Sequence, residues 1–464
     1  MHIDTKQSRR AFLQRAAQLS TAGVAAPMLG SLGLLGEAAA AATTSADYKA
    51  LVCVFLYGGN DHANTLVPYD TESHSAYFAL RPRIGVSRAL LGPTALTTEN
   101  DLGGLEFALN PALKPLQPIF AQGDLAALLN VGALVEPTTK SAYLSKSVRL
   151  PPKLYSHNDQ QSYMQSFAPE GADAGWGGRM GDLMLASNGT AALTCISMQG
   201  RALWLTGQDA LPYTAQANAV NNLLGGNGTL YDSSVVYDAL RTLMMNDEHT
   251  SWIAQEHAKV VQRSVSIGDA VTSALANAPE SAFTTFANNG NSLADQFKMV
   301  ARLISVGPQL GLRRQVFFVS QGGYDTHSAQ ASRHPELLGT LAQAMSEFHA
   351  ATKKIGMDEQ VTTFSMSDFG RTLGDNGDGS DHGWGATHFV MGGAVKGGRI
   401  YGTPPAIGLN TNDDVHTGRV IPTTSADQMA ATLGLWFGVP ARDLPTILPN
   451  INNFSPSSWN LGFL

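Results

Sequence analysis

Residues 48–57 read YKALVCVFLY, a run in which nearly every side chain is apolar and strand-forming. A strand without a polar face has to be covered on both sides, as it is in a parallel sheet packed between helices. Five shorter apolar runs follow, at residues 126–131, 193–198, 316–320, 361–367 and 388–391. Helical patterns separate several of these runs, so the sequence predicts an α/β fold with a mostly parallel central sheet and helices on both faces.

The clearest helical pattern lies at residues 335–354, where apolar side chains recur at helical spacing behind a proline suited to a first turn. This segment joins the fourth and fifth apolar runs, as in a βαβ unit. Helical patterns also dominate residues 230–312, which we interpret as an insertion. A chain of 464 residues is long enough for two or three average domains. We expect a single large α/β domain over residues 43–464.

The N-terminal segment has the features of an export signal. Arg9 and Arg10 precede a phenylalanine and a leucine, then a weakly apolar stretch at residues 16–35 and a run of alanines at 38–42. This order predicts a twin-arginine signal peptide in residues 1–42, hence a bacterial periplasmic or secreted protein that meets the twin-arginine translocase during export. An ordinary amphipathic helix is the alternative. No later segment approaches ~20 uninterrupted apolar residues, so no permanent membrane span is predicted.

Charge and cysteine content narrow the function classes. Charged residues make up 14% of the chain, the formal net charge is −7, and no block of lysine and arginine occurs. A nucleic-acid partner is therefore not expected. Cys53 and Cys195 each lie inside an apolar run, which predicts buried free thiols; a disulfide in an oxidising compartment is the alternative.

Polar side chains gather where the apolar runs end. Ligands of open α/β sheets bind at the carboxyl ends of the strands. Carboxylates and imidazoles are ligands of zinc, and carboxylates with water suit magnesium or calcium, so a divalent cation is the expected cofactor. The expected metal ligands, in chain order, are Asp61, Asp325, His327, Asp368, Asp381, His382 and His388. The competing interpretation is that these residues only cap turns or fill the core.

Two further segments carry catalytic residue types. Ser156 precedes a helical run and follows two prolines, so it is either a helix N-cap or an activated nucleophile. His157, beside it, would then act as acid or base, or as a metal ligand. Arg371 follows Asp368 closely and would stabilise an anionic group. We therefore take Ser156, His157 and Arg371 as candidate catalytic residues.

Several of these motifs resemble those of an exported bacterial family known as domain of unknown function 1501. The matching motifs are Gly58-Gly59-Asn60-Asp61, Ser156-His157-Asn158, Gly323-Tyr324-Asp325-Thr326-His327, Ser367-Asp368-Phe369-Gly370-Arg371 and Asp381-His382-Gly383-Trp384-Gly385. The resemblance implies membership of the alkaline phosphatase and sulfatase superfamily, with an alkaline phosphatase-like α/β sandwich and one or two metal ions at the strand ends. Two features depart from that superfamily. Phe369 stands where the phosphatases have a ligand histidine, and neither cysteine has the Cys-x-Pro-x-Arg context of sulfatases.

These patterns favour a metal-dependent hydrolase of a phosphate or sulfate ester, with a small anionic ester or a polysaccharide as substrate. The alternative is a non-catalytic periplasmic binding or assembly protein on a degenerate scaffold of the same type. Phe369 and the lack of a clear nucleophile support that alternative. A redox enzyme is disfavoured because the chain has neither a cysteine-rich cluster motif nor a dinucleotide-binding glycine motif.

Overall fold

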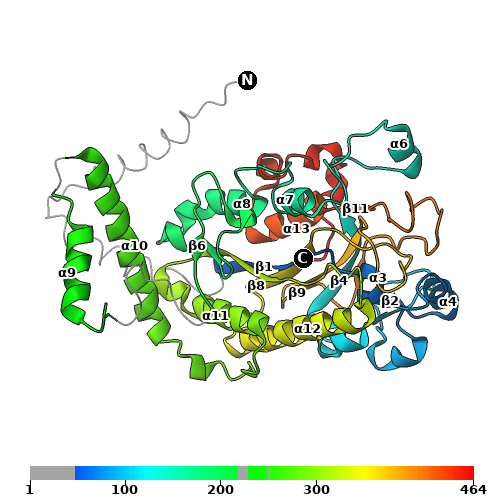
Figure 1. Ribbon diagram of the computed structural model, residues 1–464, viewed down its shortest axis with the longest axis horizontal. Coiled ribbons are helices and arrows are strands. Elements are labelled where there is room, and N and C mark those ends of the chain that lie inside the picture. Colours follow the sequence, from blue (N-terminus) through cyan, green and yellow to red (C-terminus); the bar gives the residue numbers. More distant parts are fainter. Residues whose placement is uncertain (1–46, 218–227, 249–250) are drawn as a thin grey trace. The chain divides into compact units, whose positions relative to one another are not determined.

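The apolar runs form the strands of one central sheet (Figure 1). A computed structural model describes residues 47–217, 228–248 and 251–464. The predicted export signal lies outside these described residues. All six predicted strands are confirmed, and they are β1 (Lys49–Leu56), β4 (Leu125–Gly132), β5 (Cys195–Ser197), β7 (Arg314–Gln321), β8 (Val361–Ser367) and β9 (Ala386–Met391).

Strand directions make the sheet mixed but mostly parallel. The order is β10-β4-β9-β8-β1-β7-β5-β6, with β6 (Tyr213–Thr214) and β10 (Ile400–Tyr401) at the two ends and β11 (Thr424–Ser425) paired with β4. The central strand β1 runs parallel to both β7 and β8, whereas β9 runs antiparallel to β8 and β4. The prediction of a mostly parallel sheet is confirmed. Because β9 is reversed, it begins at the edge of the sheet where β1, β7 and β8 end.

Both faces of the sheet are covered, which explains the uniformly apolar sequence of β1. Val52 and Val54 belong to one apolar core, while Cys53 and Phe55 belong to the core on the opposite face. Helices α11 (Ser292–Val306) and α12 (Gln330–Lys354) cover the first face, and α8 (Trp176–Met184) and α13 (Ala426–Phe437) cover the second (Figure 1). Both cysteines are free and buried, in agreement with the expected thiols.

The helix between β7 and β8 is longer than its sequence pattern indicated. Helix α12 begins at Gln330, so Pro335 lies inside it rather than at its first position. Pro335 is the sixth residue of this helix, so its missing N–H costs one backbone hydrogen bond, the one to the carbonyl of Ala331. The region 230–312 holds α9 (Ser234–Met245), α10 (Trp252–Ala276) and α11, and α11 packs against both α12 and β7.

Shorter elements complete the described chain. An antiparallel pair, β2 and β3, lies apart from the main sheet in hydrogen bonding. Among the described helices, none is long and apolar enough to cross a membrane. The remaining strands and α-helices are β2 (Leu66–Pro68), β3 (Phe107–Leu109), α3 (His62–Thr65), α4 (Thr71–Leu80), α5 (Gln117–Ala121), α6 (Lys140–Ser145), α7 (His157–Ser166) and α14 (Leu444–Ile447).

Candidate metal centre

Segments from distant parts of the sequence meet at the carboxyl edge of the central strands. Strands β1, β7 and β8 are parallel neighbours, so the loops that follow them start side by side. One loop joins β8 to the reversed strand β9 at the same edge, and a bridge between Arg371 and His382 holds its two arms together. Helix α7 adds its first residue, His157, which reaches Asp368.

Asp325 is the centre of this cluster. One of its carboxylate oxygens lies 3.0 Å from Nε2 of His327 and 3.2 Å from Nε2 of His382, and the other lies 3.5 Å from Nε2 of His157. His157, Asp325 and His382 each offer one ligand atom, and these atoms lie within 4.8 Å of one another. Two imidazoles and a carboxylate at such spacing form a donor set that suits a divalent cation.

The orientation of His157 is fixed from behind by Asp368. Nδ1 of His157 donates to the buried Asp368 carboxylate across 2.7 Å. Asp368 also accepts from the side-chain amide of Gln161 at 2.8 Å and from the backbone N–H of Gly58 at 3.2 Å. With its proton held on Nδ1, the neutral ring directs the Nε2 lone pair towards Asp325. The hydrogen bond to Asp368 also raises the pKa of His157. A cation therefore has to compete with a proton for this ring up to a higher pH than it would for an ordinary histidine.

A second histidine is oriented in the same way by a backbone carbonyl. Nδ1 of His382 donates to the carbonyl oxygen of Tyr155 at 2.7 Å, which leaves its Nε2 lone pair free. Burial lowers the pKa of His382 and favours the neutral ring that a metal requires. Nδ1 of His327 lies 3.2 Å from an oxygen of Asp381, and its Nε2 lies 2.9 Å from Nε2 of His382. Two neutral rings cannot both accept at that distance, so a proton or a cation has to lie between them or beside them.

One further observation supports a cation at this site. Nε2 of His157 is buried and has no hydrogen-bond partner among the described residues. A buried ring nitrogen without a partner is costly, and a metal ion beside Asp325 would satisfy it. His157, Asp325 and His382 would hold the ion, and His327 with Asp381 would border it.

Arg371 supplies the fixed positive charge of the site. Its buried guanidinium donates to Asp325 at 2.7 Å and to the carbonyl oxygen of Gly58 at 3.3 Å, and it also bonds Ser380. Burial is the largest influence on Asp325 and opposes its ionisation, but the hydrogen bond and charge of Arg371, together with His327 and His157, outweigh burial and lower the pKa of the carboxyl group. These contacts keep Asp325 charged near neutral pH and hold a fixed positive charge beside the cluster.

Phe369 supports the two histidines. Its ring centroid lies 4.9 Å from that of His157 and 4.7 Å from that of His382. The ring needs Gly59 beneath it, because a Cβ atom at that position would lie 2.5 Å from the phenylalanine ring. Where the resemblance implied a ligand histidine, the structure therefore places an aromatic ring that restricts how the two imidazoles can move.

Asp61, an expected metal ligand, is engaged elsewhere. Its side chain is fully buried and forms an ion pair with Arg81 at 2.8 Å, and it accepts a hydrogen bond from the amide of Gln330. Burial opposes its ionisation, yet Arg81 lowers its pKa. One carboxylate oxygen of Asp61 has no partner among the described residues. No hydrogen bond or ion pair joins Asp61 to His157, Asp325 or His382.

Ser156 and His388 are also not brought into contact with Asp325. Ser156 is the N-cap residue of α7, but its hydroxyl donates to the carboxylate of Asp159 at 2.8 Å instead of capping a backbone N–H. His388 lies within β9, opposite Leu128 of β4, and both of its ring nitrogens lack a partner among the described residues.

Sequence reasoning missed two supports of the cluster. Gln161 stands four residues after His157 on α7, so both side chains lie on one helix face and reach the same carboxylate. That spacing was a usable signal. The carbonyl of Tyr155 gave no signal. Its direction depends on a positive φ of 72°, which a tyrosine side chain does not predict.

Replacing His388 with leucine is expected to stabilise the protein towards acid and to leave its metal content unchanged. Burial lowers the pKa of His388 to about 4, against 6.5 for an exposed histidine. As the pH falls from 6.5 to 4, the unfolded wild type binds a proton that the folded protein refuses, which costs the fold about 3 kcal/mol. Urea unfolding at pH 7.5 and pH 4.5 should show a gain for the variant that is larger at low pH. Loss of the ion in the folded variant would instead identify His388 as a ligand.

The fold and the cluster define a mixed α/β protein with a mostly parallel sheet and a histidine–carboxylate site at its carboxyl edge. The chain belongs to the family described as "Protein of unknown function (DUF1501)", which matches residues 48–448. This confirms the family that the motifs resemble.

Comparison with curated proteins gives no match. Among solved structures, the chain is similar to "Crystal structure of Ps i-CgsB in complex with k-i-k-neocarrahexaose", at 10% identity and a TM-score of 0.34. It is also similar to "Crystal structure of Ps i-CgsB", at 10% identity and a TM-score of 0.35. Each likeness covers 88% of this chain and 77% of the other. These TM-scores are too low to assign a shared fold.

Proposed function

We propose that the chain is an exported metal-dependent hydrolase of a phosphate or sulfate ester, built on an alkaline phosphatase-like α/β scaffold. The observation that carries the proposal is the convergence of His157, Asp325 and His382, whose ligand atoms lie within 4.8 Å of one another. The orphaned Nε2 of His157 and the close approach of His327 to His382 support a cation there.

A divalent ion at this site would polarise the ester and lower the pKa of a bound water. The protein's own groups then have distinct tasks. Arg371, fixed by Gly58 and Ser380, would bind a charged oxygen of the substrate. His327, whose side chain is 44% exposed, is the ring most accessible to substrate, and Asp381 orients it through Nδ1. This pair would carry the proton that the reaction transfers. Because the hydroxyl of Ser156 is engaged by Asp159, we assign the attacking oxygen to water.

The test starts from mature protein stripped with a chelator and reloaded separately with zinc, magnesium or calcium. We expect about one tightly bound ion per chain, as three protein ligands would provide. Turnover should depend on the ion and should be measured with aryl phosphate, aryl phosphodiester and aryl sulfate esters. The preferred ester then identifies the substrate class. Protein that binds no ion and hydrolyses none of these esters would overturn the proposal.

A second candidate is a non-catalytic binding or assembly protein, and Phe369 favours it. The ring packs against His157 and His382, and Arg371 already occupies one oxygen of Asp325. Such a site would bind its ion without turning over any ester. Stoichiometric metal without hydrolysis, together with a partner that co-purifies from cell envelopes, would decide for this function.

Export by the twin-arginine translocase and a periplasmic or secreted location are part of the same proposal. They rest on the sequence of residues 1–42 alone. Residues 1–42 fused to a reporter that is active only after export should yield activity, and changing Arg9 and Arg10 to lysine should abolish it. Equal reporter activity with and without the arginine pair would refute this route.

A further inference from the structure

A chain of buried polar side chains leads from the metal centre into the fold, and it starts at Arg371. The guanidinium donates through Nη1 to Asp325, through Nη2 to the carbonyl oxygen of Ser380 and through Nε to the Ser380 hydroxyl at 3.4 Å. That hydroxyl donates to Oε1 of Gln330 at 2.6 Å, and the amide of Gln330 donates to Asp61. The side chains between Asp325 and the far carboxylate are fully buried, so their hydrogen bonds do not compete with water.

The charge of Asp61 sets the direction of the hydrogen bonds in this chain. A carboxylate only accepts, so the amide of Gln330 has to turn its NH₂ group towards Asp61 and its Oε1 towards Ser380. The single hydroxyl proton of Ser380 is thereby committed to Gln330. Its oxygen is left to accept from Nε of Arg371. The ion pair with Arg81, at 2.8 Å, favours the charged form of Asp61 and so keeps this order.

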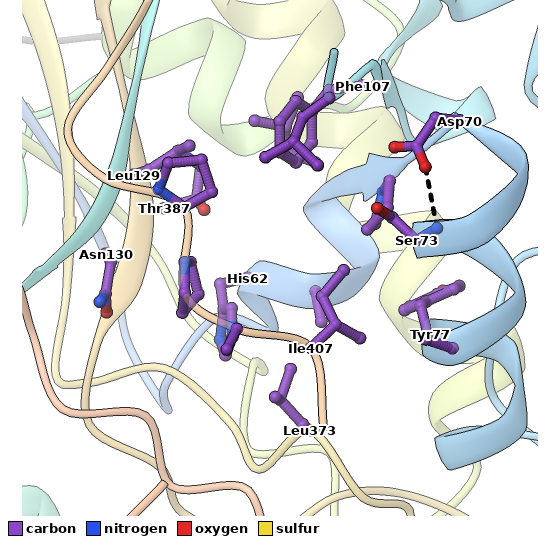
Figure 2. Close-up of a pocket in the computed structure, with 18 of the residues that line it drawn as sticks. His62, Asp70, Ser73, Tyr77, Phe107, Leu129, Asn130, Leu373, Thr387 and Ile407 are labelled. Carbon is purple, nitrogen blue, oxygen red and sulfur yellow. Dashed lines mark hydrogen bonds between the residues drawn. The ribbon is translucent and has the colours of Figure 1, made fainter. Parts of the chain in front are cut away.

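The far end of the chain closes inside the fold. Arg81 donates to Oδ1 of Asn64 at 2.7 Å, and the hydroxyl of Tyr77 donates to the same oxygen at 2.6 Å. Figure 2 shows Tyr77 on α4, at the wall of a cavity lined by residues of β2 and β3. Its hydroxyl also accepts from the backbone N–H of Val86 at 2.8 Å, so it is satisfied within the fold. Among the side chains of this chain, Asp325 is the exposed one, and the chain therefore opens at the metal centre.

We propose that Gln330 is a positioning residue of the metal centre, which orients Ser380 so that Arg371 stays fixed against Asp325. A guanidinium held at both Nε and Nη2 keeps its Nη1 group in one place, and the carboxylate that Nη1 contacts is held with it. Gln330 is the first residue of α12, so its amide ties this helix to the loop between β8 and β9. The inference rests on the proposed function, because it takes Asp325 as a ligand of the ion.

The experiment measures zinc affinity by competition with a fluorescent chelator. Gln330→Leu removes both hydrogen bonds of the amide, and we expect it to weaken zinc binding about tenfold, within the 10–100-fold cost of changing a partner of a metal ligand. One ion should still bind at excess zinc, so affinity and not metal content is the readout.

Gln315→Leu is the matched control. Gln315 is also a fully enclosed glutamine with two hydrogen bonds, since it accepts from the hydroxyl of Tyr48 at 2.5 Å and donates to the carbonyl oxygen of Leu193 at 3.1 Å. It lies near the start of β7, at the edge of the sheet opposite the metal centre. Its loss should lower the melting temperature and leave zinc affinity unchanged.

A double-mutant cycle tests whether the two links act in series. Ser380→Ala removes the hydroxyl between Gln330 and Arg371, and we expect it to weaken zinc binding about tenfold as well. Gln330→Leu/Ser380→Ala should again lose about tenfold, whereas independent contributions would multiply to about a hundredfold. A loss near a hundredfold would overturn the proposal.

A measurement on metal-free protein separates this inference from the proposed function. The Nε–H group of Arg371 is observed by NMR after labelling with ¹⁵N-arginine, and Arg371→Lys identifies its signal. Its hydrogen exchange should be at least about tenfold faster in Gln330→Leu than in the wild type or in Gln315→Leu. Protein that binds no zinc would overturn the hydrolase, while this exchange rate still decides the role of Gln330.

Three results would overturn the proposal: wild-type zinc affinity in Gln330→Leu, equal losses of affinity in the two glutamine variants, or an unchanged exchange rate at Arg371. Melting temperatures confirm that the variants fold. If Gln330→Leu does not fold, Ser380→Ala removes the same link from its other side, and wild-type affinity there would be equally decisive against the proposal.

Discussion

Asp325→Asn is expected to remove the bound ion and to lower ester hydrolysis by more than about a hundredfold, since even outer partners of a metal site cost 10–100-fold when changed. Asp325 is the carboxylate that His157, His327 and His382 all approach within 3.5 Å. Asparagine keeps the size of the side chain but loses the charge that holds a cation and pairs with Arg371. Metal content by elemental analysis and kcat/KM on the best ester measure the effect.

Asp378→Asn is the matched control for this variant. Asp378 lies on the same loop between β8 and β9 as part of the site, is exposed, and accepts from the backbone N–H of Ala329. It makes no contact with the histidine cluster, so its replacement should leave metal content and turnover near wild-type values. Wild-type metal content and turnover in Asp325→Asn would refute the assignment of the site. Melting temperatures separate a loss of metal from a loss of fold.

Asp61→Ala is expected to destabilise the protein by about 3–5 kcal/mol, because it leaves the Arg81 guanidinium buried without its carboxylate. Both side chains are fully buried, and they lie 2.8 Å apart. Arg81 also donates to the side chain of Asn64 and to the carbonyl oxygen of Thr372, but neither of these groups supplies a negative charge. Urea unfolding of wild type and variant at pH 7.5 gives the difference in free energy directly.

The double variant Asp61→Leu/Arg81→Met separates the two roles that Asp61 can have. Replacing a buried ion pair with apolar residues of similar size is often neutral, so the double variant should regain most of the lost stability. It should also keep its metal, because Asp61 makes no contact with His157, Asp325 or His382. A stable double variant that had lost its ion would show that Asp61 is a ligand after all.

Residue patterns predict the strands of this protein well and miss the reversal of one of them, β9. The runs located all six main strands because a strand buried on both faces is rich in apolar residues, although β8 also holds two threonines and two serines. The reversal of β9 has no such signature, since an apolar strand reads the same in either direction. Its start was also placed two residues late, at His388 instead of Ala386. Because of this displacement, His388, which lies inside the sheet, was expected in the loop before the strand.

The same limit applies to the candidate site: residues beside strands could be predicted, and their partners on other elements could not. Asp325, His327, Asp368, Asp381 and His382 were placed together because each follows a strand or lies in the loop that precedes one. The partner of Asp61 could not be predicted, because Arg81 follows α4 and its approach depends on how that helix packs. Phe369 was interpreted as a lost ligand because sequence alone does not show that a ring can support two imidazoles from the side.

Because β9 runs antiparallel to β8, the single loop between these strands carries several residues of the cluster. Asp368, Arg371, Asp381 and His382 all lie between the end of β8 and the start of β9, and only His157, Asp325 and His327 come from elsewhere. Exchanging this single loop between relatives would replace these four residues together, whereas His157 and Asp325, two of the three residues whose ligand atoms converge, would stay in place. Four of the seven residues of the cluster can therefore be altered together by grafting one peptide segment.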